Sequence, residues 1–133
     1  MNNQVKRYVV TAFLLLALAV ILGAFGAHAL RDRLSDHYLS VWETANRYHF
    51  YHALGILGCC ALYPSYVGNN ELTRLFLLLS GGLILFSGSL YVLSLADYLQ
   101  IPGLKILGAV APIGGLLFVS GWIYAAVAVL RQK

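Results

Sequence analysis

The chain has 133 residues, of which 60% are hydrophobic and 11% are charged, and its formal net charge is +4. Soluble domains carry about 25% charged residues, so a water-soluble globule could not cover its surface with so few. The lysines and arginines stand near the ends of apolar runs, as cations at lipid headgroups do, and form no basic stripe that would indicate a nucleic-acid surface. We expect one membrane domain, residues 1–133.

The first apolar run, residues 8–30, predicts a membrane-spanning helix. It has 23 residues without a charged side chain, enough to cross a hydrocarbon core of about 30 Å at 1.5 Å per residue. The alternative is a signal peptide, since Ala27-His28-Ala29 resembles a cleavage site. Because the run is long for a signal sequence, we interpret it as the first span.

The stretch from Arg31 to Arg47 is the most polar part of the chain. Its apolar residues recur on one face of a helix, and they are Leu34, Tyr38, Val41, Trp42 and Ala45. This pattern predicts an amphipathic interfacial segment between the first and second spans, or one that leads straight into the second span and lengthens it. The second span, about 46–63, is the least apolar of those expected, and the Pro-Ser-Tyr-Val-Gly-Asn-Asn sequence at 64–70 predicts a turn after it.

Two further spans are expected at 75–96 and 106–130, with 22 and 25 residues free of charge. Pro112 lies inside the last run and predicts a kink there, because proline cannot donate a backbone hydrogen bond. Small residues at helical spacing in three spans predict close helix packing. The glycines in these faces are Gly23, Gly26, Gly81, Gly88, Gly114 and Gly121.

Four spans make an all-α membrane protein, a four-transmembrane-helix bundle with both termini on one side of the membrane. Five lysines and arginines then stand on the terminal side and four on the other. The positive-inside rule favours the cytoplasm for the terminal side.

Three of the four histidines stand where the first span ends and the second begins. In an antiparallel hairpin these ends meet, which predicts a polar cluster of His28, His52, His49, Tyr48, Glu43 and Trp42. Such a cluster could hold a metal or haem or hydrogen-bond a quinone headgroup. It could equally be a structural clasp, because neutral imidazoles bridge helices by hydrogen bonds. We favour the clasp and keep the ligand site as the alternative.

No motif indicates catalysis, metal binding or transport. Ser87 and Ser89 have no neighbouring base, and there is no nucleophile elbow. The adjacent Cys59 and Cys60 lie in an apolar run without zinc-site spacing, and we interpret them as packing residues. The middles of the expected spans are apolar, whereas a carrier places ionisable groups there.

Several segments resemble one family in order and spacing along nearly the whole chain. They are Leu22-Gly23-Ala24-Phe25-Gly26-Ala27-His28, Trp42 and Thr44 ahead of Tyr48 and His52, Phe86-Ser87-Gly88-Ser89-Leu90-Tyr91, Pro112-Ile113-Gly114-Gly115, and Gly121-Trp122. This pattern resembles the YgdD/YwdK family of small integral membrane proteins. The resemblance implies four transmembrane helices and a bacterial inner-membrane location. It implies no activity, because the family is a domain of unknown function. His28 and His52 match the family's motif and His49 does not, so a three-histidine metal site is disfavoured.

Three functions remain open. The first is a non-catalytic packing or interaction protein, self-associated or an accessory subunit of a membrane complex. The second is a site for haem, quinone, lipid or metal at the His28/His52 end. The third is an oligomeric channel or carrier. We expect the lipid bilayer as the surroundings and no cofactor or nucleic acid, with haem, quinone or a bound lipid as the alternatives for a ligand.

Overall fold

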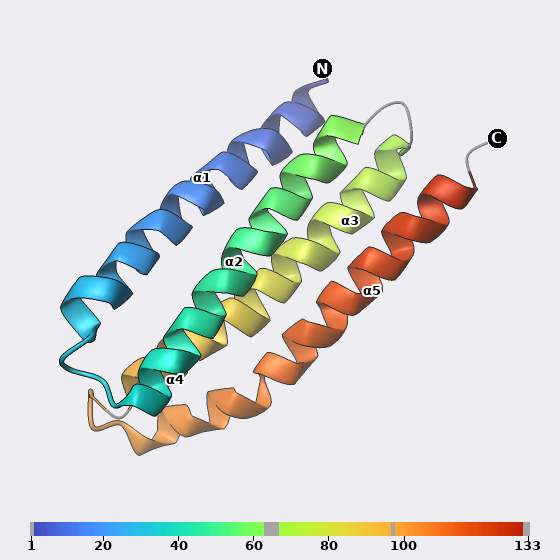
Figure 1. Ribbon diagram of the computed structural model, residues 1–133. Coiled ribbons are helices and arrows are strands. Elements are labelled where there is room, and N and C mark those ends of the chain that lie inside the picture. The colour runs from blue at the N-terminus through green and yellow to red at the C-terminus, as the bar shows by residue number, and fades with distance from the viewer. Residues whose placement is uncertain (1, 63–66, 97, 132–133) are drawn as a thin grey trace.

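The computed structural model describes residues 2–62, 67–96 and 98–131, and this part of the chain is helical without a strand. Four helical segments lie side by side along one long axis (Figure 1). Their elements are α1 (Asn3–Phe25) with the π-helix η1 (Gly26–Leu30), α2 (Asp36–Leu62), α3 (Asn69–Gly82) with the π-helix η2 (Leu83–Gly88) and α4 (Ser89–Ala96), and the 3₁₀-helix η3 (Pro102–Ala109) with α5 (Ala111–Leu130). The all-helical class predicted from the sequence is confirmed.

Three of these segments are long and apolar enough to cross a membrane, namely Asn3–Leu30, Asn69–Ala96 and Pro102–Leu130. They contain the expected spans 8–30, 75–96 and 106–130. The segment α2 is 27 residues long but is not among them, because Glu43, Arg47 and two histidines interrupt its apolar residues. The part of the predicted 64–70 turn from 64 to 66 lies outside the described residues.

Of the two arrangements expected for the polar stretch between the first two spans, the structure has the one in which this stretch leads straight into the next helix. The polar stretch after Asp36 is the first half of α2, which continues to Leu62 and packs antiparallel to α1 (Figure 1). The apolar face that the sequence showed is buried inside the bundle, where Leu34, Trp42 and Ala45 form a small core with Leu30 and Tyr91. Burial against neighbouring helices, rather than headgroup contact, satisfies this amphipathic pattern.

The larger core lies between α2, α3 and α5, and α1 completes it near the terminal end. Its most deeply buried side chains are Ile56, Leu72, Leu75 and Leu79. At the end that carries both termini, Gln4 Nε2 donates to Thr73 Oγ1 at 2.6 Å, and the rings of Tyr8 and Phe76 stack with centroids 4.0 Å apart. These contacts tie α1 to α3, so α1 is held by two neighbours.

Pro112 lies in the first turn of α5 rather than inside a continuous helix. The preceding eight residues form the 3₁₀-helix η3, and the chain changes direction where η3 meets α5 (Figure 1). A proline near a helix start costs no hydrogen bond, because the first amide groups have no partner within the helix. The predicted interruption is therefore a junction between two kinds of helix.

Most of the glycines in the predicted packing faces lie against a neighbouring helix. A Cβ at Gly26 would come within 2.5 Å of the Trp42 ring, and one at Gly121 within 2.9 Å of Leu79. At Gly114 the Cβ would collide with the backbone of Leu85 and Phe86. At Gly23 and Gly81 the nearest atoms belong to Asn46 and Leu117. Gly88 meets only the carbonyl of Leu83 on its own segment, at 3.9 Å.

Gly114 should be the least replaceable of these glycines. Gly114→Ala places a methyl group against the backbone of η2, which cannot move aside as a side chain can. We expect it to lower the free energy of unfolding by about 1–3 kcal/mol, the usual cost of overpacking. Unfolding of the purified protein in mixed micelles measures this effect. Gly115→Ala is the matched control, because its Cβ meets the Phe86 ring at an ordinary 3.8 Å; equal effects of the two variants would contradict the assignment.

Candidate functional site

A chain of polar side chains joins α1, α2 and α4. Asn46 Nδ2 donates to the Ala19 carbonyl at 2.8 Å and to Tyr91 Oη at 3.0 Å. One turn earlier on α2, Trp42 Nε1 donates to the Leu22 carbonyl at 3.0 Å. In lipid such donors have no water to replace the protein acceptor, so both side chains hold α2 to the backbone of α1.

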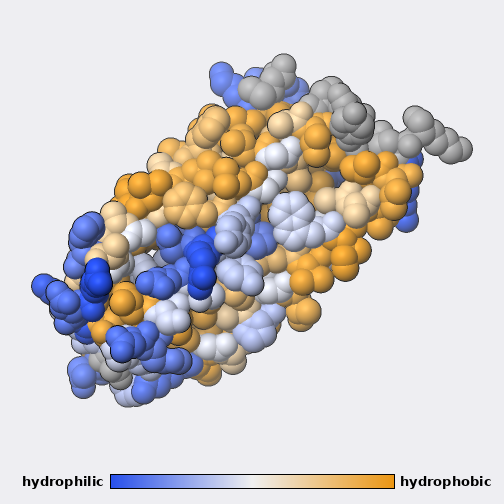
Figure 2. All heavy atoms as spheres, in the orientation of Figure 1, coloured by the Kyte–Doolittle hydropathy of each residue, from blue (hydrophilic) through white to orange (hydrophobic). Residues whose placement is uncertain are grey.

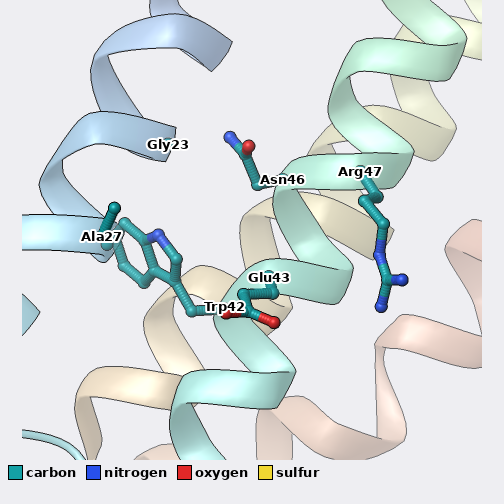
Figure 3. Close-up of a pocket in the computed structure, with 7 residues that line it drawn as sticks. Gly23, Ala27, Trp42, Glu43, Asn46 and Arg47 are labelled. Atoms are coloured by element: carbon teal, nitrogen blue, oxygen red, sulfur yellow. The ribbon is translucent and has the colours of Figure 1, made fainter. Parts of the chain in front are cut away.

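The two glycines of α1 make this approach possible. Figure 3 shows Trp42 and Asn46 directed from α2 toward α1, with Asn46 beside Gly23. A side chain at Gly23 would meet Asn46 Oδ1 at 3.0 Å, and one at Gly26 would overlap Trp42. The small-residue face of the first span therefore accepts polar and aromatic side chains of α2.

The chain of hydrogen bonds continues to His49. Tyr91 Oη accepts from Asn46 and lies 3.4 Å from His49 Nδ1, and the tautomer of the ring determines which of these two atoms donates. The ring is 4% exposed, and Nε2 has no hydrogen-bond partner among the described residues.

His52 has different surroundings. Its Nδ1 donates to the Tyr48 carbonyl on the same helix at 2.8 Å. The ring stacks on Phe118 of α5, with centroids 3.4 Å apart, and lies 6.0 Å from the Trp122 ring. His52 thus packs between α2 and α5, while His49 faces α1 and α4.

The structure does not bring His28 to His52. The Asn46–Ala19 hydrogen bond aligns the two helices, and from that level His28 lies nine residues toward one end and His52 six residues toward the other. At 1.5 Å per residue they are about 22 Å apart along the axis. His28 is exposed in η1. Within the described ranges, no three His, Cys, Asp or Glu residues are grouped to hold a metal.

A cleft of about 290 Å³ lies beside the α1–α2 contact. Its lining residues are Gly23, Gly26, Ala27, Trp42, Glu43, Asn46 and Arg47 (Figure 3). Glu43 and Arg47 are exposed, and the Arg47 side chain runs along α2 to the level of Glu43 (Figure 3). Tyr48, the next residue, is 40% exposed and packs on Phe86 with centroids 4.5 Å apart.

These charges lie deep along the long axis of the bundle. Asn46 bonds to Ala19, and Ala19 is twelve residues from both Arg7 and Arg31, the charges that flank the first apolar run. Arg47 therefore begins about 18 Å from either end of that run. Figure 2 agrees: the blue and white residues extend from the lower-left end into the apolar body along the face over α2.

Sequence reasoning missed Asn46 and Tyr91, the two residues at the centre of the polar chain. Asn46 lies four residues after Trp42 and three before His49, on one helical face. That spacing within a run expected to span the membrane was the available signal, because a polar group there needs a partner. Tyr91 belongs to the Phe86–Tyr91 segment quoted for the resemblance, but its contact with α2 depends on the packing of α4.

An all-helical bundle with three long apolar helices and many exposed apolar side chains defines a small integral membrane protein. The chain belongs to a family described as protein of unknown function (DUF423), whose sequence profile matches residues 22–115. The UPF0382 membrane protein YwdK of Bacillus subtilis is 40% identical over 126 residues, which cover 95% of this chain and 98% of that protein. UPF0382 membrane proteins of Staphylococcus epidermidis and Staphylococcus haemolyticus are 40% and 41% identical, each covering 95% of this chain and 97% of the relative. No solved structure matches the chain. The predicted family and the membrane class are confirmed.

Asn46→Leu tests the polar chain, because it keeps a similar volume and removes both donors. Hydrogen bonds between membrane helices contribute about 0.6 kcal/mol on average and up to about 1.7. With two bonds lost, we expect the free energy of unfolding in mixed micelles to fall by about 1–3 kcal/mol. Tyr51→Phe, at an exposed ring on the same helix, is the control that should change nothing. If Asn46→Leu were as stable as the wild type, the hydrogen bonds of Asn46 would not contribute to holding α2 against α1.

Proposed function

We propose that this protein is a non-catalytic interaction protein of the bacterial inner membrane, with four membrane-crossing helices and cytoplasmic termini, and that α2 joins it to a second copy of itself. The observation that carries the proposal is the exposure of Glu43 and Arg47 at the depth of the apolar run. Charged side chains at such depth are costly in lipid and usually meet a partner or a water-filled cavity.

Glu43 and Arg47 have opposite charges and are one helical turn apart on the same exposed face. No hydrogen bond joins either of them to the rest of the described chain. The Arg47 side chain reaches the level of Glu43 (Figure 3), so the two opposite charges lie at the same depth along the helix. Across a twofold axis parallel to the helices, each Arg47 can meet the Glu43 of the other copy, so the same patch is complementary to itself.

The glycine faces do not compete with this surface for a second copy. Gly26, Gly114 and Gly121 lie against side chains or backbone within the bundle. What faces outward at membrane depth is the polar face of α2. We therefore base self-association on charge pairing there rather than on small-residue seams.

The alternatives call for other arrangements. A haem, quinone, lipid or metal site shared by His28 and His52 needs the two side chains together, whereas the helix alignment places them on different levels. A channel would need a ring of copies with the α2 faces turned to a common axis. The number of copies in the assembly separates a dimer from such a ring.

Charge reversal tests the dimer. In nanodiscs or mild detergent we expect a dimer by native mass spectrometry and cross-linking. Glu43→Arg or Arg47→Glu alone places like charges together and should weaken the dimer at least about tenfold, since like-charge contacts cost several kcal/mol. The double variant restores opposite pairs and should restore the dimer.

Lys105→Glu, which reverses an exposed charge on η3 away from α2, is the matched control and should leave the dimer unchanged. A wild-type protein that stays monomeric in lipid, or a double variant no better than the single ones, would overturn the proposal. A ring of several copies would instead support the channel.

The last crossing and the side of the C-terminus have their own test. A fluorescent protein fused to the C-terminus should fluoresce, and alkaline phosphatase there should be inactive, because both termini are expected in the cytoplasm. An insertion at Gly103, where no atom lies within 4 Å of the Cβ position, should give the opposite pair of results. The same result at both sites would mean that the η3–α5 segment, which lies between them, does not cross the membrane.

A further inference from the structure

A second cleft, of about 170 Å³, lies between α1, α2 and the η2–α4 segment. Its surface is almost wholly apolar, and leucines of α1 and η2 form most of it. Leu18 and Ile84 also line the cleft and are 44% and 71% exposed. The cleft therefore opens sideways between these two residues, toward lipid, and is separate from the Glu43/Arg47 face.

The polar side chains beside the cleft turn their polar atoms away from it. His49 Nε2 and Ser87 Oγ are buried inside the bundle. Tyr91 Oη lies 3.0 Å from Asn46 Nδ2 and 3.4 Å from His49 Nδ1, so it is used between the helices. A molecule in the cleft meets carbon almost everywhere, and apolar cavities of this size stay free of water. The occupant must itself be apolar.

The cleft is long, narrow and placed at the middle of the membrane. Leu15 and Leu22 both line it, and seven residues separate them, about 10 Å along α1. Ala19, between them, is twelve residues from both Arg7 and Arg31, the charges that flank the apolar run. A cavity of about 150 Å³ holds the six carbons of benzene. A similar volume spread along α1 is a slot on the order of one alkyl chain wide, which we call the α1–η2 slot.

Gly88 lines the α1–η2 slot, and no other helix packs against it. A Cβ at Gly88 would meet only the Leu83 carbonyl of its own segment, at 3.9 Å, whereas one at Gly26 or Gly114 would overlap a neighbouring helix. Glycine inside a helix is less favourable than alanine. Packing within the bundle does not account for Gly88, but it leaves room in the slot that a side chain would fill.

The first helix also lacks specific contacts on this side. Hydrogen bonds tie α1 to α2 and, near the terminal end, to α3. In the described part of the chain, no hydrogen bond or ring contact joins α1 to η2 or α4. Helices in lipid associate largely through close packing. A molecule that fills the slot would supply packing between α1 and the η2–α4 segment.

We propose that the α1–η2 slot binds one acyl chain of a membrane lipid, which enters between Leu18 and Ile84 and packs α1 against η2 and α4. The slot follows the helix axis, and membrane helices are tilted only about 20° from the bilayer normal. An acyl chain therefore reaches the slot already lying in its direction. A fused-ring molecule is too wide for it. The site does not involve Glu43 or Arg47, so it does not depend on the proposed dimer.

Brominated lipid tests the site, because bromine on an acyl chain quenches tryptophan fluorescence at short range. The Trp42 ring lies 4.6 Å from the ring of Tyr91, which lines the slot. The chain has two tryptophans, so Trp122→Phe leaves Trp42 as the reporter. In nanodiscs of dibrominated phosphatidylcholine we expect Trp42 to be quenched. Gly88→Leu in the same background puts a side chain into the slot and should remove most of this quenching.

Gly58→Leu is the matched control, because it makes the same replacement on α2 where no atom lies within 4 Å of the Cβ position. It should be quenched like the background. Native mass spectrometry from mild detergent should show one phospholipid retained per chain in the wild type and in Gly58→Leu, and none in Gly88→Leu. Unfolding should show Gly88→Leu at least as stable as the wild type, because the new side chain displaces no neighbouring helix.

Three results would overturn the proposal. One is equal quenching of Trp42 in Gly88→Leu and Gly58→Leu. Another is equal lipid retention by these variants, or retention of a molecule that is not a lipid. The third is a loss of stability in Gly88→Leu, which would mean that Gly88 packs against the chain itself rather than bordering a lipid site.

Discussion

The structure depends on two side chains of α2 that donate hydrogen bonds to the backbone of α1. Trp42 and Asn46 reach the Leu22 and Ala19 carbonyls. They can do so because Gly23 has no side chain at the contact. Lipid offers α1 and α2 little apolar driving force for association, since lipid tails are as apolar as leucine. Directed hydrogen bonds and close packing therefore decide where along α1 the second helix lies.

That alignment determines how deep in the bundle the polar residues of α2 lie. It carries Glu43 and Arg47 to the middle of the bundle's length, although in sequence they precede the apolar part of α2. It also places His49 against α1, next to Tyr91 of α4, and leaves Nε2 of that ring without a hydrogen-bond partner among the described residues. A slip of one helical turn would move the charges by about 5 Å and break both backbone contacts.

The bundle thus has two polar features with different neighbours. The exposed charges of α2 face outward, where we propose that those of a second copy pair with them. The buried polar atoms His49 Nε2 and Ser87 Oγ, in contrast, lie inside the bundle and have no hydrogen-bond partner among the described residues.

Much of the fold could be predicted from the sequence, because apolar length and helical spacing are local properties. The three long apolar runs, the membrane class and the family follow from residues close together in the chain. For the Arg31–Arg47 stretch both an interfacial position and continuation into the second span stayed open, because periodicity alone does not distinguish burial in a bundle from burial in a membrane surface. The histidine cluster was predicted because His28, His49 and His52 stand near the connection between the first two spans in the sequence.

Composition and periodicity by themselves determined that this chain is helical and belongs in a membrane, since 11% charged residues cannot solvate a globule. Only the tertiary structure decided which polar groups meet. It separated His28 from His52, joined Asn46 to Tyr91 and left Ser87 without an acceptor. The physical reason is that helix formation satisfies the backbone locally, whereas the depth and rotation of each helix depend on hydrogen bonds and glycine contacts between segments far apart in the chain.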